Sequence, residues 1–168
     1  MRRLISALVF VAPVAILGAL IAQSVETAAQ NPPTPVPAQT PFNPGIADLM
    51  NIIVQPRHTK LWYAGREGNW ALAEYQTKEL RAAFANVVRA RPRFRDQPTG
   101  DLIKTFMSTP LDTLDAVVKE HNATKFAEAF AGVNAGCNAC HVALNQSFVV
   151  IKTPEQPAYP DQDFRPQK

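Results

Sequence analysis

The sequence predicts an all-α fold, and specifically an antiparallel four-helix bundle. From Gly45 to about Phe148 the apolar residues recur with a helical period of about 3.6 residues. Glycine, asparagine and proline residues divide this stretch into segments of helical length, and only residues 148–151 look like a strand. A chain of 168 residues, of which 46% are apolar, is long enough to bury one core and short for two. We therefore expect four helices with short connections around a single core.

The first 29 residues are predicted to be a signal for export. Two arginines near the start precede residues 4–22, which form an uncharged apolar run, and this is the pattern of a signal peptide. Pro13, Gly18 and the small residues that end at Ala29 favour cleavage, which would remove residues 1–29. The run of 19 residues is nearly long enough to span a bilayer, so an uncleaved N-terminal anchor is the alternative. In both cases we expect a periplasmic location, with membrane attachment only if the segment is retained.

Prolines mark the two ends of the helical domain. Six prolines lie between residues 30 and 44, and proline both disfavours helix and lacks the N–H donor that a strand ladder needs. We therefore assign residues 30–43 to an extended linker and residues 44–150 to the helical domain. Residues 151–168 contain further prolines and are expected to pack as extended chain over the surface or to remain loose.

The first half of the domain is predicted to form two helices. The first helix ends at Gly65 and is kinked by Pro56. Asn69 is a good N-cap for the second helix, which runs to about Ala90 and stops before a proline. The residues expected on the inner stripe of this second helix are Ala73, Leu80, Phe84 and Val87.

The second half of the domain is predicted to form two more helices. One continuous helix from Pro110 to Phe148 would be about 58 Å long at about 1.5 Å per residue, too long for its partners to cover, so we place a break near Asn122. Pro110 is expected to divide the third helix into two pieces, with Thr109 as an N-cap. The inner face of the third helix carries Ile103, Met107, Leu111, Leu114, Val118 and His121. The last helix has a single stripe of Phe126, Phe130, Val133, Cys137, Cys140, His141 and Leu144.

The chain has two cysteines, Cys137 and Cys140, and His141 follows the second one directly. This Cys-x-x-Cys-His pattern is the attachment motif of c-type haem. On a helix, positions i, i+3 and i+4 share one face, so both sulfurs reach the two vinyl-derived carbons of one haem while the imidazole points at its iron. The sequence therefore predicts one covalently attached haem c on the C-terminal helix, with His141 as an axial ligand.

Three other roles for the two cysteines stay open at this point. A thioredoxin-like dithiol shares the Cys-x-x-Cys spacing, but it normally follows a strand, and helical periodicity precedes the motif here. A structural zinc site needs four ligands, and the remaining histidines, His58 and His121, are isolated in the sequence. A disulfide between Cys137 and Cys140 would close a very small loop and constrain the unfolded chain little. Haem attachment is therefore the favoured interpretation.

The segment from Phe126 to His141, FAEAFAGVNAGCNACH, resembles the C-terminal helix of class II c-type cytochromes, the cytochrome c-prime group. The resemblance covers residues 44–148 in the number and order of the helices, but only the motif region is specific. It implies an antiparallel four-helix bundle with the haem between the helices, His141 as the proximal ligand and, in many members, a homodimer formed through the first two helices.

The chain departs from this family after the motif. Family members usually end a few residues beyond it, often with a basic residue four positions past the histidine. Here Asn145 holds that place, and 27 residues follow His141. We expect this tail to cover the haem edge that is exposed in the family.

The resemblance also directs attention to the first helix, which offers the side chain on the other side of the iron. An apolar side chain there leaves the iron five-coordinate, whereas a methionine makes it six-coordinate. Counting back from Gly65 by the helix length of the family leads to Met50 as the candidate distal ligand. His58 is a less favoured candidate, since it lies about 12 Å further along a helix, and an open coordination position is the third alternative.

These features predict a mono-haem electron-transfer protein of the periplasm, which cycles between Fe(III) and Fe(II) and is not an enzyme. Two other functions stay open: a five-coordinate haem protein that binds nitric oxide or carbon monoxide, and a Cys-x-x-Cys thiol oxidoreductase. The expected partners are periplasmic redox proteins, and nucleic acid is not expected for an exported protein with a formal net charge of only +3. The alternating arginines of residues 89–95 are interpreted as a solvated helix end, with a docking patch for an acidic redox partner as the alternative.

Overall fold

The computed structural model describes residues 42–156 and 158–167. Most of these residues are helical, in agreement with the predicted fold class. The strands among the described residues form one sheet of two short strands. The helices are α1 (Ile46–Leu49), a π-helical segment (Met50–Val54), α2 (Gln55–Arg66), α3 (Trp70–Ala90), α4 (Thr99–Lys119) and α5 (Ala123–Ala143). The strands are β1 (Arg93–Phe94) and β2 (Gln97–Pro98), which pair antiparallel.

Residues 1–41 lie outside the described residues. The signal peptide or anchor of residues 1–29 and most of the linker of residues 30–43 therefore remain predictions. In the part of the chain that is described, none of the helices combines the length and the apolar character needed to cross a bilayer.

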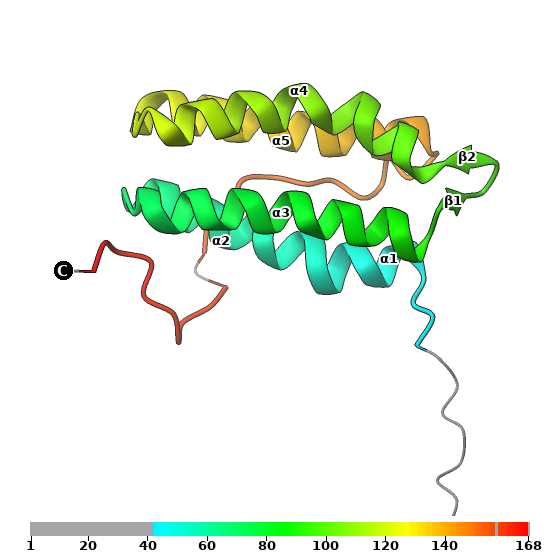
Figure 1. Ribbon diagram of the computed structural model, residues 1–168, viewed down its shortest axis with the longest axis horizontal. Helices are drawn as coiled ribbons and strands as arrows, with labels where there is room; N and C mark the ends of the chain where they lie inside the picture. Colours follow the sequence, from blue (N-terminus) through cyan, green and yellow to red (C-terminus); the bar gives the residue numbers. More distant parts are fainter. Residues whose placement is uncertain (1–41, 157, 168) are drawn as a thin grey trace, which may run out of the picture. The chain divides into compact units, whose positions relative to one another are not determined.

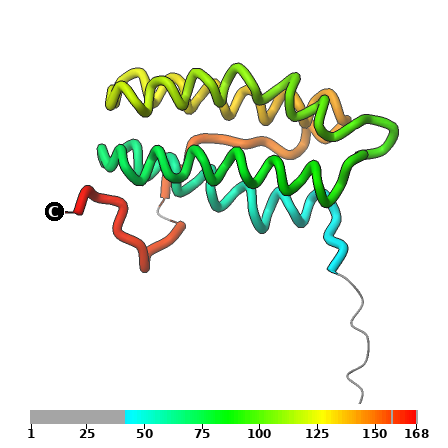
Figure 2. Tube along the Cα trace, viewed as in Figure 1, coloured from blue at the N-terminus to red at the C-terminus, as the bar shows by residue number. Residues whose placement is uncertain are grey.

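The long helices lie in two pairs, and consecutive helices run in alternating directions (Figure 1). Helix α2 packs along α3 and helix α4 packs along α5, while α3 meets α4 and α2 meets α5 across the two pairs. The chain that follows α5 turns back and runs as extended chain along the space between the pairs (Figure 2). This returning segment is therefore part of the packed domain.

The apolar stripes of the helices meet in one core, and its most aromatic part closes one end. The inner residues of α3 named from the sequence, which are all buried, are Ala73, Leu80, Phe84 and Val87. Phe126 and Phe130 of α5 are fully buried, and the Trp62 ring lies 6.0 and 5.0 Å from their ring centroids. Burying each phenylalanine ring contributes about 1.5–3 kcal/mol. At the same end His121, which has a φ of 54°, stacks on Trp70 with centroids 5.6 Å apart.

The first helix changes its hydrogen-bond pattern just before Pro56. Over residues 50–54 it is π-helical, and the amide of Gln55 bonds to the carbonyl of Met50, five residues back. Pro56 has no N–H, and its ring would clash with the carbonyl of Ile52 in a regular α-helix, so the wider turn relieves this conflict. The disturbance expected at Pro56 thus takes the form of a π-helical turn, a feature often found at functional sites.

The prediction that Pro110 divides the third helix is wrong. Helix α4 continues from Thr99 to Lys119 with Pro110 inside it. A Cβ atom placed on Gly136 of α5 would lie 3.3 Å from the ring of Pro110 and 2.6 Å from the carbonyl oxygen of Phe106, so α4 and α5 approach each other closely here. Packing of the proline ring against α5 offsets the cost of proline in a helix interior, which is about 3 kcal/mol.

Gly65 also differs from the prediction, because it is not the residue that stops the first helix. Helix α2 continues through Gly65 to Arg66, and Gly68, with a φ of 71°, makes the turn. Phe126 packs directly on Gly65, and a Cβ atom there would lie 2.2 Å from the phenylalanine ring. The absence of a side chain is what allows α2 to approach α5 at this point.

The arginine-rich segment continues from the end of α3 into the β1–β2 hairpin. Arg91 donates to the carbonyl oxygens of Pro44 and Asn43 at 2.6 and 2.7 Å. Arg95 donates to the carbonyl oxygen of Leu144 at 3.0 Å, at the end of α5, where a cation is favourable to the helix dipole. These arginines therefore tether the chain before α1 and the C-terminal end of α5.

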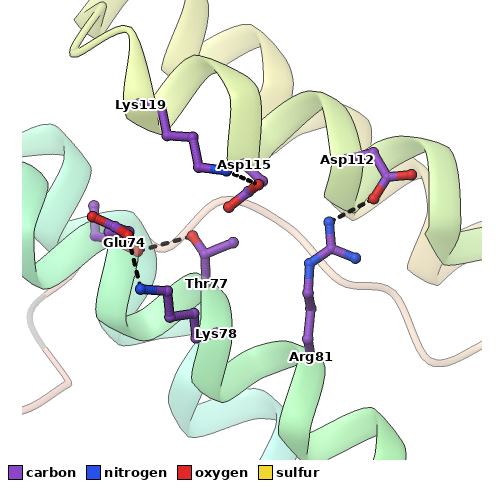
Figure 3. Close-up of polar contacts among 8 residues, drawn as sticks. Glu74, Thr77, Lys78, Arg81, Asp112, Asp115 and Lys119 are labelled. Carbon is purple, nitrogen blue, oxygen red and sulfur yellow. Dashed lines mark hydrogen bonds and ion pairs between the residues drawn. The ribbon is translucent and has the colours of Figure 1, made fainter.

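An ion pair joins α3 to α4 on the outside of the domain (Figure 3). Arg81 of α3 lies 2.7 Å from Asp112 of α4, and both side chains are exposed. Within α3 and within α4, lysines pair at 2.8 Å with carboxylates one turn before them. Exposed pairs of this kind contribute about 0–1 kcal/mol each, so the apolar core supplies most of the packing energy.

Replacing Gly65 with alanine should destabilise the fold, even though alanine is the better helix former. The clash with Phe126 costs about 1–3 kcal/mol, whereas the gain in helix propensity is roughly 1 kcal/mol. Gly132→Ala in α5 is the matched control, because nothing lies within 4 Å of a Cβ atom at that position, and it should stabilise the protein. Urea unfolding followed by circular dichroism measures both changes, and a stabilised Gly65→Ala variant would contradict the close contact.

Candidate functional site

A cavity of about 350 Å³ opens between the π-helical segment, α3, α4, α5 and the chain that follows α5. Its volume lies at the lower end of the range of roughly 300–1,000 Å³ that is typical of small-molecule and cofactor sites. The walls are almost entirely apolar, and the residues that line them include Val54, Leu80, Phe84, Phe94, Ile103 and Val133. A molecule bound here would be held mainly by apolar contact.

The three residues of the predicted attachment motif line this same cavity. Cys137, Cys140 and His141 occupy positions i, i+3 and i+4 of α5, so they share one face of the helix. The helix has Asn122 as its N-cap, and the side-chain oxygen of Asn122 accepts the amide of Lys125 at 3.0 Å, in agreement with the predicted break. The structure therefore brings both thiols and the imidazole to one apolar space.

Burial keeps both thiols protonated near neutral pH. The cysteines are free. Loss of hydration is the main reason why the pKa of Cys137 is raised to about 12, and the neighbouring Cys140 adds to this effect. Burial also raises the pKa of Cys140. Since the thiolate is the nucleophilic form of cysteine, neither residue is activated for thiol exchange.

One ring nitrogen of His141 is held by the backbone. Nδ1 of His141 lies 2.7 Å from the carbonyl oxygen of Val149, and because a carbonyl oxygen only accepts, Nδ1 carries the proton and donates it. Nε2 then keeps its lone pair, which is the form in which neutral imidazole binds a metal. Metal-binding histidines commonly have such a partner, which sets the tautomer and the ring orientation. His141 is therefore prepared to act as a ligand through Nε2.

Two asparagines of α5 belong to the site although they are not among the residues predicted from the sequence. Asn138 exchanges two hydrogen bonds with the backbone of Ile151, at 2.8 and 2.7 Å. Asn134 donates to Oγ1 of Thr153 at 3.0 Å. With His141 they form a polar row at positions i, i+4 and i+7 in a largely apolar half of the helix, and this spacing is the sequence signal that could have identified them.

Two methionines line the cavity. Met50, the predicted distal ligand, is partly buried and belongs to the π-helical segment. Met107 of α4 is buried, and a Cβ atom on Gly136 would lie 3.1 Å from its sulfur. Because the Met107 sulfur is packed between α4 and α5, Met50 is the methionine with the more accessible side chain.

His58, the less favoured candidate for the distal ligand, also lines the cavity but is buried against α5. Its Nε2 lies 2.6 Å from Oδ1 of Asn134, and its ring packs on Phe130 with centroids 4.6 Å apart. The amide nitrogen of Asn134 donates a hydrogen bond to Thr153, so its Oδ1 is the acceptor that faces His58. Nε2 of His58 therefore carries a hydrogen and donates it to Oδ1. Binding of iron through Nε2 would require this hydrogen bond to break.

These residues fit a covalently bound haem. Two thiols, an imidazole with a free Nε2 and a thioether line one apolar cavity. Thr99 also lines it, and the buried hydroxyl of this residue has no hydrogen-bond partner among the described residues. In the same part of the chain, no three His, Cys, Asp or Glu side chains are grouped so that they could hold a bare metal ion, but haem iron takes only one or two protein ligands.

Comparisons with known proteins do not assign the chain to a family. No protein-family model matches it, and no curated protein or solved structure is significantly similar to it. The resemblance to class II c-type cytochromes therefore remains an expectation from the motif region, and the interpretation of the site depends on its geometry.

The buried His58 should make the protein less stable as the pH falls. Loss of hydration lowers the pKa of His58 below its usual value of 6.5, and the hydrogen bond to Asn134 opposes this only in part. The unfolded chain therefore binds more protons below about pH 6.5 than the folded chain does, and the free energy of unfolding falls there by at most about 1.4 kcal/mol per pH unit.

His58→Gln is the variant that tests this expectation, because glutamine keeps an N–H donor for Asn134 but does not titrate. Urea unfolding between pH 7.5 and 5.5 should show a shallower pH dependence for the variant than for the wild type. His121 and His141 are unchanged in both proteins, so their contributions cancel. Identical slopes would show that His58 does not titrate differently on folding.

Proposed function

We propose that this protein is a mono-haem c-type cytochrome of the class II kind that transfers electrons between redox proteins in the periplasm. In this proposal α2, α3, α4 and α5 form an antiparallel four-helix bundle around the haem, Cys137 and Cys140 attach it, and His141 binds its iron. The observation that carries the proposal is that these three side chains line one apolar cavity.

Attachment through the two thiols needs no oxidant or reductant. Cys137 and Cys140 would each hold the haem through a thioether, the net result of adding S–H across one vinyl group, with sulfur on the inner carbon and hydrogen on the outer carbon. An uncharged thioether suits the partly buried positions of Cys137 and Cys140, because burial penalises the charged thiolate. The covalent bonds also retain the cofactor in a small domain whose core could not hold it by apolar contact alone.

The haem, when bound, supplies a one-electron couple between Fe(III) and Fe(II). The residues of the chain bind and orient it. The apolar walls exclude water and lower the local dielectric constant, and the hydrogen bond from Nδ1 to Val149 fixes the ring of His141. No group in this arrangement has to react with a substrate, which is why electron transfer is proposed instead of an enzymatic activity.

Met50 is the proposed sixth ligand. It lines the cavity from the π-helical segment, whereas Nε2 of His58 is already engaged by Asn134. Six-coordinate iron favours electron transfer, and an open position would favour binding of a small gas. A thiol oxidoreductase is less well supported, because its reactive cysteine needs a lowered pKa, and both pKa values are raised here.

Loss of both sulfurs should abolish haem attachment. We expect the Cys137→Ser/Cys140→Ser double variant, exported with the haem attachment machinery, to have the mass of the bare polypeptide. The wild type should carry the added mass of one haem, and a single Cys137→Ser variant, which keeps one thiol, serves as the intermediate control. Mass spectrometry of the intact protein measures this, and a wild-type protein without the added mass would refute the proposed function.

The spin state of the iron should depend on Met50 and not on Met107. We expect the reduced wild-type protein to have a low-spin visible spectrum that carbon monoxide does not change, and Met50→Leu to become high-spin and to bind the gas. Met107→Leu is the matched control, because it removes the other sulfur that lines the cavity. A high-spin wild type that binds carbon monoxide would instead indicate an open position and a gas-binding function.

A further inference from the structure

After α5 the chain reverses direction and runs back alongside the helix. Asn145 has a φ of 56°, its amide bonds to the carbonyl of Val142 at 3.0 Å, and the amide of Gln146 bonds to the carbonyl of His141 at 2.7 Å. This pair of bonds is the Schellman arrangement, which requires a residue in the left-handed conformation. Asparagine adopts that conformation more readily than other residues with side chains. Asn145 therefore makes the reversal of the chain possible.

The returning chain, residues 149–153, meets the polar row of α5 at three points, and we call it the strap. The three contacts are His141 with Val149, Asn138 with Ile151 and Asn134 with Thr153. The row extends about 10 Å at about 1.5 Å per helical residue, and the strap extends about 13 Å at about 3.3 Å per residue. Every second strap residue thus meets α5, as expected for extended chain that runs antiparallel to the helix.

The middle contact is the one that fixes the strap most firmly. The amide group of Asn138 both donates to and accepts from the backbone of Ile151, at 2.8 and 2.7 Å. Two opposed hydrogen bonds to one residue prevent the strap from sliding along the helix in either direction. The carbonyl oxygen of Val149, which accepts the hydrogen bond from Nδ1 of His141, is only two residues away from Ile151.

We propose that Asn138 is a positioning residue for the iron ligand: by holding Ile151, it keeps the carbonyl oxygen of Val149 on Nδ1 of His141. This inference rests on the proposed function, since it concerns His141 as a ligand. Asn138 acts through the strap and does not line the cavity, whereas Val149 and Ile151 do. The strap therefore also closes one side of the cavity.

A carbonyl acceptor on Nδ1 has a defined effect on the ligand. Hydrogen bonding to a metal-bound histidine raises the basicity of its ring, and a more basic ligand stabilises Fe(III) relative to Fe(II). The strap thus lowers the reduction potential relative to a His141 that faces water. The long tail, which the resembled family lacks, would in this way adjust both the ligand and its access to solvent.

The test compares Asn138→Ala with Ser147→Ala, which changes an exposed residue in the turn between α5 and the strap. Both variants should retain covalent haem by mass spectrometry. In Asn138→Ala the reduction potential should rise, and the proton on Nδ1 of His141, followed by nuclear magnetic resonance, should exchange with solvent on the order of tenfold faster, because two hydrogen bonds that hold the strap are lost. Ser147→Ala should match the wild type in both measurements.

A second variant tests the role of the strap if Asn138→Ala does not fold. Thr153→Val removes the acceptor for Asn134 at the far end of the strap, so it should change the potential and the exchange rate in the same directions but by less. Haem-loaded Asn138→Ala protein with wild-type potential and wild-type exchange would overturn the positioning role. If the wild type itself carries no haem, the proposed function fails and the ligand role falls with it, while the exchange of the Nδ1 proton still shows whether Asn138 holds the strap on His141.

Discussion

The hydrogen bond from His141 to the carbonyl of Val149 is the contact on which the site depends. It gives the two nitrogens of one imidazole different roles, since Nδ1 is occupied by the backbone and Nε2 is left with its lone pair. In water the two tautomers of histidine compete, and a net hydrogen-bond energy of about 1 kcal/mol changes such a competition about fivefold. The contact forms only because α5 ends at Ala143 and the chain reverses at Asn145. The way in which α5 ends therefore determines which nitrogen of His141 carries the proton.

The helices are packed around aromatic side chains at one end of the domain, and the cavity lies toward the other end. Along α5 the large rings of Phe126 and Phe130 are followed by Gly136 and the two cysteines, whose small side chains leave much of the space unfilled. An enclosed apolar cavity of 350 Å³ would cost about 8 kcal/mol at about 24 cal/mol per Å³. That upper bound is comparable to the whole stability of a typical domain, about 5–15 kcal/mol. The cavity opens between the helices, so its actual cost is below this bound, and an apolar occupant would add contacts that the open walls lack.

Local signals in the sequence predict much of the fold, and the failures lie where tertiary contacts decide. Asn69 acts as an N-cap as expected, because a cap depends on neighbouring residues only. The predicted break near Asn122 is also found, and Asn122 is the N-cap of α5. Pro110 and Gly65 do not end helices, since the close approach of α4 to α5 and the ring of Phe126 determine their roles. These contacts join residues distant in the sequence, so no local pattern contains them.

The same distinction applies to the site. The two thiols and the imidazole line one cavity because helical spacing alone places them on one face. The partners of Asn138 and Asn134 in the returning chain depend on where the turn at Asn145 places that chain beside α5, and this is a tertiary contact. A row of polar residues in an apolar helix indicates that these residues have hydrogen-bond partners, but it does not identify the partners.

Met50 and His58 differ in the contacts that each would lose by binding iron. The Asn134 amide is used at both ends, by His58 on its oxygen and by Thr153 on its nitrogen. If His58 turned to bind iron, the buried oxygen of Asn134 would lose its partner, at a cost of about 1–3 kcal/mol. The ring would also leave its contact with Phe130. Met50 has no hydrogen bond to break, because a thioether sulfur is only a weak acceptor. In the proposed haem protein the energetic balance therefore favours Met50 or an open position, and the two differ in how far the π-helical segment would bring the Met50 side chain toward the iron.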